Sequence, residues 1–183
     1  MGDITKSTHA KYAKILLKIF EIIKNKYNLT VNKEDIFKIK FMKEYYIKED
    51  LEKKMIVIFI PLKSLKKFRR IQYFFIKEFE SYIPNTYLSV LSIRTIKPLK
   101  YQKISKTGSY SWSFTNVADD IIRDMLFPGN IVGKRIFFFS NEDVFIQIYL
   151  EDKYKNFNNS KINLVTRSLH SLIHKKIHIV LTS

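Results

Sequence analysis

Residues 55–82 read MIVIFIPLKSLKKFRRIQYFFIKEFESY, and this stretch decides most of the fold prediction. It opens with a continuous apolar run from Met55 to Ile60, which is typical of a strand buried on both faces. Pro61 ends that strand. From about Ser64 to Tyr82 the apolar residues recur at helical spacing, and the predicted helix ends before Pro84.

The predicted helix over 64–82 has two opposite faces of different chemistry. Its apolar face consists of Leu65, Phe68, Ile71, Phe75, Ile76, Phe79 and Tyr82, and its basic face of Lys63, Lys66, Lys67, Arg70 and Lys77. No acidic residue occurs between Pro61 and Lys77, whereas a solvated helix face ordinarily includes glutamates for ion pairing. We therefore favour an anion-binding face over a solvated one. Phe74 lies within the basic face, where it either stacks on a base, touches a neighbouring protein or has a simple packing role.

The same periodicity arguments predict further elements on both sides of this stretch. Predicted helices cover 8–27 and 163–174, and another begins at an N-cap, Asn116, with Asp119 in its first turn, and ends at Met125 or Leu126. Predicted strands cover 36–46, 87–96, 131–139, 144–150 and 177–181, and predicted turns and loops cover 48–54, 97–114, 141–143 and 152–160.

The order of the predicted elements is the same in both halves of the chain. It runs helix, strand, strand, helix, strand in 1–96, and again in 115–183 after the basic loop 97–114. The pattern predicts an α+β fold: two successive helix-strand-strand-helix-strand units packed as one compact mixed α/β protein, a single domain over 1–183. The strands form either two packed α+β units or one mixed sheet with helices on its faces.

Composition restricts the class of function. The 183 residues include 33 Lys+Arg, 17 Asp+Glu and no cysteine, for a net charge of +16. Absence of cysteine excludes a disulfide scaffold, a cysteine nucleophile and a thiolate zinc site. The longest apolar run, Met55 to Ile60, is far shorter than the roughly 20 residues of a membrane span, so we expect no membrane partner. The positive charge, which is spread over both halves, indicates a polyanionic partner.

A second acid-free stretch supports the polyanion interpretation. Between Glu80 and Asp119 no acid occurs, while basic residues recur at nearly regular spacing around Tyr101. These residues are Arg94, Lys97, Lys100, Lys103 and Lys106. A solvated flexible loop has a similar composition, but the lack of counter-charge favours contact with a polyanion.

No arrangement of residues predicts catalysis. Gly133-Lys134 lacks the upstream glycine of a phosphate-binding Walker loop and is better explained as a turn into a strand. His170, His174 and His178 have no carboxylate nearby to complete a zinc site, and we interpret them as ordinary surface or RNA-facing histidines. Asp119, Asp120 and Asp124 are better explained by helix capping and the helix dipole than by general acid–base catalysis. We therefore expect no enzyme, metal, cofactor or small-molecule substrate.

Two strings carry a family resemblance. The predicted strand 55–60 and helix 64–82, with the proline between them, contain Phe-x-Pro followed by Phe-x-x-Ile-Gln, at Phe59, Pro61, Phe68, Ile71 and Gln72. The second string is Phe127-Pro128, two residues, and then Ile-Val-Gly-Lys-Arg-Ile at 131–136. Both strings resemble the eukaryotic small-subunit ribosomal protein S7e family. The chain differs from the family pattern at Thr95, where a second arginine is typical, and in its shorter loop 97–114.

The resemblance implies a structural constituent of the cytoplasmic small (40S) ribosomal subunit, assembled in the nucleolus. Its partners would be ribosomal RNA and neighbouring ribosomal proteins, and it would act in subunit assembly, rRNA processing and translation. The predicted RNA-binding residues are Lys63, Lys66, Lys67, Arg69, Arg70, Lys77, Arg94, Lys97, Lys100, Lys103, Lys106, Lys134 and Arg135. The alternative is a free-standing nucleic-acid-binding protein or ribosome assembly factor. An RNA-modifying enzyme has no support in the sequence.

Overall fold

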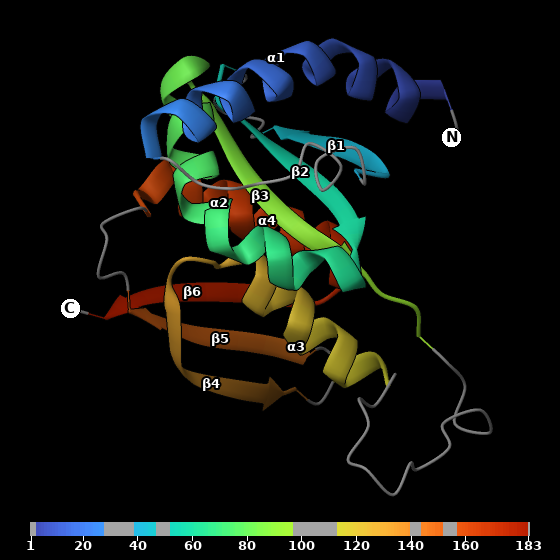
Figure 1. The fold of residues 1–183 in the computed structure, drawn as a ribbon. Coiled ribbons are helices and arrows are strands. Elements are labelled where there is room, and N and C mark those ends of the chain that lie inside the picture. Colours follow the sequence, from blue (N-terminus) through green and yellow to red (C-terminus); the bar gives the residue numbers. More distant parts are fainter. Residues whose placement is uncertain are drawn as a thin grey trace, which may run out of the picture.

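A computed structural model describes residues 3–27, 39–46, 52–96, 113–139, 144–151 and 157–182. Its elements follow the order predicted from the sequence (Figure 1). The first unit consists of α1 (Asp3–Tyr27), β1 (Phe41–Tyr46), β2 (Lys54–Pro61), α2 (Leu62–Tyr82) and β3 (Thr86–Ile93). The second consists of α3 (Phe114–Met125), β4 (Asn130–Phe138), β5 (Val144–Glu151), α4 (Asn159–Ile173) and β6 (Lys176–Thr182). The α+β fold class and the repeated element order are thereby confirmed.

The strands form two separate sheets with the same topology. One sheet has the order β1-β2-β3 and the other β4-β5-β6. In each, the first pair of strands is antiparallel and the second pair is parallel. The parallel pairs are β2 with β3 and β5 with β6, and a helix connects the two strands of each, as parallel pairing requires. Of the two predicted arrangements, the structure therefore has two packed α+β units.

Strand β2 lies at the centre of the molecule, which explains its unbroken apolar sequence. Ile56, Ile58 and Ile60 face a core formed with α1, α2 and β3. Met55, Val57 and Phe59 face a second core formed with α3, α4, β5 and β6. The second core therefore joins the two halves of the chain. Because both faces of β2 are covered, each side chain from Met55 to Ile60 is buried.

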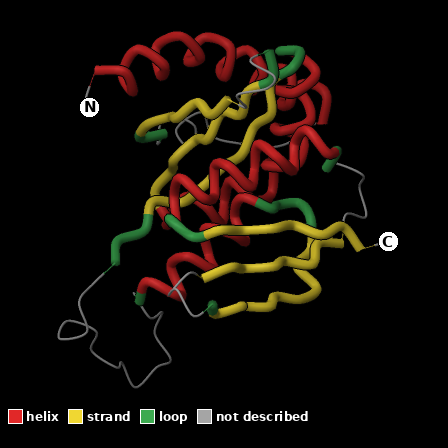
Figure 2. Tube along the Cα trace, turned by 180° about the vertical axis from the view of Figure 1, so that it is seen from behind, coloured by secondary structure: helices red, strands yellow, loops and turns green. Residues whose placement is uncertain are grey.

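Helices and sheets alternate as layers through the molecule. Helices α1 and α2 cover one face of β1-β2-β3, and α3 and α4 lie between that sheet and β4-β5-β6. Figure 2 shows the layers from the opposite side. Along β5 the core residues Ile146, Ile148 and Leu150 alternate with the half-buried Phe145 and Tyr149, so the second sheet has one face toward α3 and α4 and one outer face.

The starts of α3 and α4 differ from the prediction because the sequence analysis placed the N-cap of α3 at the wrong residue and identified no N-cap for α4. The N-cap of α3 is Ser113, whose Oγ accepts a hydrogen bond from the Asn116 backbone N–H at 3.3 Å. The predicted N-cap Asn116 is therefore wrong, and Asp119 lies beyond the first turn. Helix α4 begins four residues earlier than predicted, because Asn158 caps it through a 2.8 Å hydrogen bond from the Lys161 N–H to Oδ1. Polar residues occupy this first turn, so apolar periodicity gave no signal there.

Other boundaries differ by a few residues. Helix α1 begins at Asp3 rather than at residue 8, and β3 ends at Ile93 rather than at 96. Strand β1 covers only the C-terminal part of the predicted strand 36–46. Tyr82 is exposed although we placed it on the apolar face of its helix. The predicted turn 141–143, and most of the predicted loops 48–54, 97–114 and 152–160, lie outside the described residues.

Candidate nucleic-acid interface

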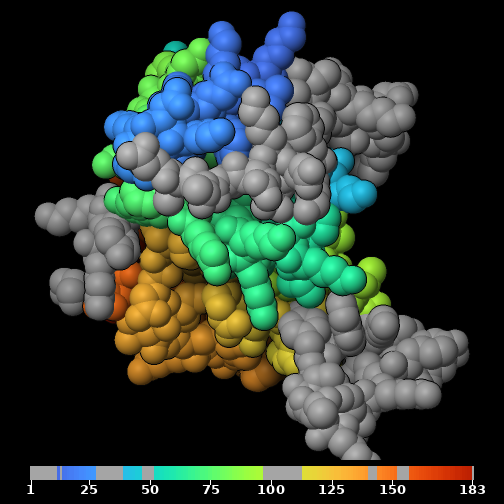
Figure 3. Space-filling model, viewed as in Figure 1, coloured from blue at the N-terminus to red at the C-terminus, as the bar shows by residue number. Residues whose placement is uncertain are grey.

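Helix α2 presents a cationic face on the surface of the molecule. The helix starts directly after Pro61, and its apolar residues pack into the core, so the opposite side faces solvent. In Figure 3 it crosses the middle of the surface, between α1 above and the second half of the chain below. We call Lys63, Lys66, Lys67 and Arg70 the α2 cationic face. All are exposed, and within the described part of the chain none forms an ion pair. Lys77 is also exposed, seven residues beyond Arg70.

Phe74 has a packing role. Its ring lies 4.4 Å, centroid to centroid, from the ring of Tyr27 at the end of α1. It is half-buried and packs against the core formed with α1. Of the alternatives that the sequence left open, the structure therefore supports packing. Phe74 separates Lys77 from the α2 cationic face.

The first acid after Lys77 is neutralised by α1. Glu78 Oε1 accepts hydrogen bonds from Lys26 Nζ at 2.7 Å and from the Tyr27 hydroxyl at 2.9 Å. The hydrogen bond from Lys26 is the largest influence that lowers the pKa of Glu78 below its usual range. The carboxylate is therefore held in its charged form and paired. Because its charge is balanced by Lys26, the Glu78 carboxylate does little to reduce the positive potential of the exposed α2 lysines.

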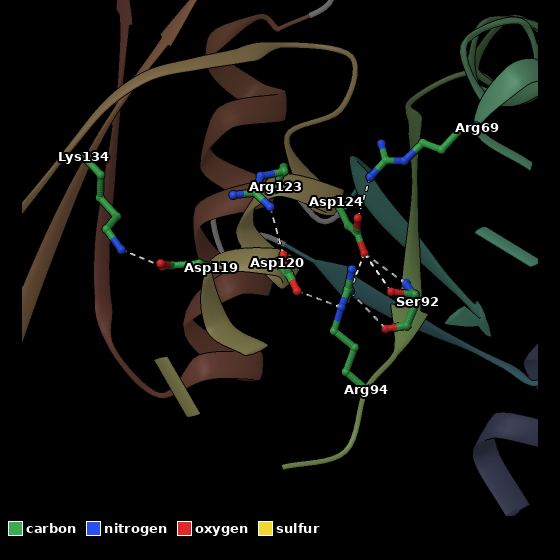
Figure 4. A network of polar contacts seen from close by, with 8 residues as sticks. All are labelled: Arg69, Ser92, Arg94, Asp119, Asp120, Arg123, Asp124 and Lys134. Carbon is green, nitrogen blue, oxygen red and sulfur yellow. Dashed lines mark hydrogen bonds and ion pairs between the residues drawn. The ribbon is translucent and has the colours of Figure 1, made fainter. Parts of the chain in front are cut away.

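Two of the predicted RNA-binding arginines lie in a network centred on Asp124 (Figure 4). Arg69 of α2 donates from Nη2 to Asp124 Oδ1 at 2.5 Å, and Arg94, directly after β3, donates from Nη1 to Oδ2. Ser92 donates to the same Oδ2 from its backbone N–H and its hydroxyl, at 3.2 and 3.0 Å. The network therefore joins α2, β3 and α3 at the edge of the first sheet.

The Asp124 network is mostly inside the protein. The side chains of Arg94 and Asp124 are 5% and 3% exposed. Burial lowers the pKa of the Arg69 guanidinium, and Asp124 opposes this shift. The Arg69 guanidinium carbon also lies 4.4 Å above the Phe127 ring centroid. Both arginines thus hold elements together, a role that sequence reasoning missed. The one available signal was the position of Asp124 between Ile122 and Met125, on the apolar side of its helix.

Lys134 and Arg135 of β4 are exposed but have contacts of their own. Lys134 Nζ lies 2.6 Å from Asp119 Oδ1, in an ion pair between β4 and α3. The guanidinium carbon of Arg135 lies 5.4 Å from the Tyr149 ring centroid. These two residues therefore offer an RNA less unpaired charge than α2 does. The loop residues Lys97, Lys100, Lys103 and Lys106 lie outside the described part of the chain.

The acidic residues of α3 form ion pairs with basic side chains and are not arranged as a catalytic pair. Asp119 forms an ion pair with Lys134. Asp120 Oδ1 lies 2.9 Å from Arg123 Nη1, and Asp120 Oδ2 lies 3.4 Å from Arg94 Nε. Our explanation by capping is wrong, because no acid lies in the first turn of α3. Among the described residues no cluster of His, Asp and Glu could hold a metal ion, and no helix is long and apolar enough to span a membrane.

The histidines occupy ordinary structural positions. His170 Nδ1 lies 3.0 Å from the Lys175 carbonyl, and His174 ends α4 in the left-handed region, with φ of 57°. The His178 ring stacks near Phe145 on the outer face of the second sheet. These three residues are therefore placed by different local contacts and do not converge on one point.

Fold and surface together define a basic α+β protein with an exposed cationic helix face. The chain belongs to the ribosomal protein S7e family, whose family model matches residues 5–181. This is a family of structural proteins and not of enzymes, so the expectation of a non-enzymatic protein is confirmed. The family match also confirms the resemblance carried by the Phe-x-Pro and Ile-Val-Gly-Lys-Arg-Ile strings.

Individual relatives are small-subunit ribosomal proteins of distant eukaryotes. The chain is 30% identical over 128 residues to small ribosomal subunit protein eS7 of Dictyostelium discoideum, covering 68% of the chain and 66% of the relative. It is 30% identical over 119 residues to eS7 of Spodoptera frugiperda, covering 60% and 63%. For eS7B of Saccharomyces cerevisiae the identity is 29% over 103 residues, covering 55% and 54%. The matched part of the chain thus spans between about half and two thirds of these relatives.

Proposed function

We propose that this protein is a structural constituent of the cytoplasmic small ribosomal subunit that binds ribosomal RNA and neighbouring ribosomal proteins. Its family membership supports a place in that subunit. The net charge of +16 supports a polyanionic partner. We further propose that it joins the particle in the nucleolus and contributes to subunit assembly and rRNA processing.

The α2 cationic face is the observation that supports RNA binding most directly. Lys63, Lys66, Lys67 and Arg70 are spaced by three or four residues, so they lie together on one side of the helix. Folded RNA is recognised mainly by shape and by phosphate and 2′-hydroxyl contacts, for which several exposed cations on a rigid element are suited. We also propose Lys77 and the four lysines of 97–106 as RNA-binding residues on the basis of the sequence. Arg69 and Arg94 are proposed to act mainly through the fold.

Charge reversal on α2 tests this proposal. The variant Lys66→Glu/Arg70→Glu/Lys77→Glu should lose co-sedimentation with salt-washed small subunits and keep the circular dichroism of the wild type. The matched control is Lys14→Glu/Lys18→Glu/Lys24→Glu, which makes the same charge change on exposed positions of α1. The control should sediment like the wild type. Normal sedimentation of the α2 variant would show that this face is not the docking surface.

The alternative is a free-standing nucleic-acid-binding protein or assembly factor, which the cationic face would also suit. A salt wash of sucrose-gradient fractions separates the two functions. A constituent remains with 40S and 80S particles after the wash, whereas a factor is released. Loss of the wild-type chain from both particles would favour the alternative.

A further inference from the structure

Strand β4 is an edge strand with exposed apolar side chains. Within the described part of the chain it pairs only with β5, so one row of its backbone N–H and C=O groups has no strand beside it. The exposed apolar residues of β4 and the residue after it are Val132 (62% exposed), Ile136 (40%), Phe137 (39%), Phe138 (78%) and Phe139 (56%). We call these five residues and this backbone row the β4 edge.

The exposed residues of the β4 edge lie on both faces of the strand. Phe137 is paired in register with Phe145, and their ring centroids are 5.8 Å apart on the outer face of the sheet. Ile136 is paired with the core residue Ile146 and so points to the face covered by α3 and α4. Ile136 remains exposed, because those helices cover β5 and β6 more fully than the edge of the sheet.

Such an edge is unusual in a protein that stays free in solution. In natural proteins a charge, a proline or a bulge ordinarily prevents an edge strand from pairing with another chain, as an exposed apolar edge otherwise does. Here the charges Lys134 and Arg135 and an irregularity at Val132 interrupt one half of β4. The other half, from Ile136 to Phe138, is continuously apolar, and so is Phe139, which follows the strand. This half therefore points to a surface that is covered in the working state.

We propose that the β4 edge binds an extended segment of a neighbouring protein, which adds a strand beside β4. This inference rests on the proposed function, which places the chain in a particle with other proteins. Backbone hydrogen bonds would hold the added strand, and its side chains would contact both faces. The proposed partner of the β4 edge is an extended segment with apolar side chains opposite Ile136 to Phe138 and a carboxylate near Arg135.

Charge and side-chain chemistry favour a protein segment over a second copy of this chain and over an RNA. A second copy of the chain would bring +16 against +16, and an antiparallel β4–β4 pair centred on Lys134 and Arg135 would oppose like charges. An RNA would gain little from Val132 and Ile136, which neither stack on bases nor bind phosphate. Lys134 is already paired with Asp119, so the edge offers few cations to a backbone of phosphates.

Photo-crosslinking in the assembled particle tests the proposal. The probe is Phe138→p-benzoylphenylalanine in the full chain, within purified salt-washed small subunits. Its matched control is the same substitution at Tyr82, an exposed aromatic residue at the end of α2. We expect a nuclease-resistant adduct of the Phe138 probe with a different protein, on an apolar peptide that contains an acid. We also expect slower amide exchange over 130–139 in the particle than in the free chain.

Other results would overturn the proposal. An adduct with rRNA, an adduct with a second copy, no adduct, or unchanged exchange over 130–139 would each contradict it. Failure of the proposed function is distinguishable, because the wild-type chain would then be absent from washed small subunits. If the chain is present but the Phe138 probe gives no protein adduct, only the further inference fails.

A pair of variants measures the contribution of the edge. Phe138→Asp should lower the amount of chain retained in small subunits by about tenfold, the effect expected for loss of one aromatic anchor. Phe138→Leu, which keeps an apolar side chain, should be retained nearly as well as the wild type. Because Phe138 is 78% exposed, both variants should fold and bind rRNA fragments with unchanged salt dependence. Equal retention of both variants would contradict the proposal.

Discussion

Arg94, directly after β3, and Asp124 of α3 form an ion pair in which both side chains are nearly inaccessible to solvent. Removing charges from water is costly, and the cost is offset only when each charge is paired and hydrogen-bonded. Asp124 meets this condition, because Arg69, Arg94 and Ser92 all donate to its two oxygens. One carboxylate thereby fixes α2 and α3 against the edge strand β3.

Asp124→Asn should destabilise the fold strongly, because it leaves two arginines without their carboxylate. Breaking a buried pair by removing one partner costs about 3–5 kcal/mol. We expect a loss near the lower end of this range, since Arg69 is partly exposed. The free energy of urea unfolding measures it. The control Asp119→Asn removes a more exposed partner of Lys134 and should cost less than about 1 kcal/mol. Similar losses for both variants would contradict this account.

Gly129→Ala should also destabilise the fold, because no space exists for a methyl group. A Cβ at Gly129 would lie 2.8 Å from Leu150 Cδ1 and 3.0 Å from the Leu126 carbonyl oxygen. Overpacking of this kind costs about 1–3 kcal/mol. A Cβ at Gly133 would meet its nearest atom, Tyr149 Cδ2, at 3.4 Å, an ordinary contact. Thermal unfolding should therefore show a clearly lower midpoint for Gly129→Ala than for Gly133→Ala.

Gln72→Met should stabilise the fold. Gln72 is wholly buried in α2, and neither its amide nitrogen nor its amide oxygen has a hydrogen-bond partner in the described structure. A buried polar group without a partner costs about 1–3 kcal/mol, and methionine has a similar length without the amide. We expect a gain of about 1 kcal/mol in urea unfolding. A loss of stability would show that the amide forms a hydrogen bond after all.

Glu78→Gln should make stability less dependent on pH in the acid range. The pKa of Glu78 is lower in the folded protein than in the unfolded chain, mainly because Lys26 donates a hydrogen bond to it. Its contribution is therefore complete above the ordinary glutamate pKa of about 4.3 and is lost as the pH falls through the lowered folded value. Urea midpoints at neutral and acid pH should differ less for Glu78→Gln than for the wild type. An equal difference would contradict the ion pair with α1.

The sequence predicted what depends on neighbouring residues and missed what depends on distant ones. The continuous apolar run from Met55 to Ile60 and the helical spacing of the apolar face of α2 indicate their burial in the sequence itself, and both predictions are confirmed except at Tyr82. The pairing of Arg94 with Asp124 spans 30 positions, and that of Arg69 with Asp124 spans 55. No periodicity links residues so far apart, so the sequence could not separate these arginines from the exposed Arg70.

The N-caps were missed for a different reason. Ser113 and Asn158 each lie in polar stretches that contain several residues able to cap a helix. Sequence alone does not show which of them the tertiary structure selects. The exposure of β4 was missed because β4 alternates poorly and reads as an ordinary strand, and its place at the edge of a sheet is a property of the topology.

The affinity of the full chain for rRNA fragments should fall steeply with salt, and α2 should account for part of that slope. Each phosphate that a cation neutralises releases counterions, and the slope of log affinity against log salt changes for each contact by roughly 0.7 on a single strand and roughly 0.9 on a DNA duplex. Lys66→Ala/Lys67→Ala/Arg70→Ala removes three exposed cations of the α2 cationic face, so it should reduce the slope by about 2. The control Lys14→Ala/Lys18→Ala/Lys24→Ala removes the same charge from exposed positions of α1 and should leave both the affinity and the slope close to those of the wild type. Filter-binding or anisotropy titrations between about 50 and 200 mM salt measure both. A slope that is flat for the wild type, or equal for the two variants, would show that the α2 cationic face does not contact phosphate and that protein contacts hold the chain in its particle.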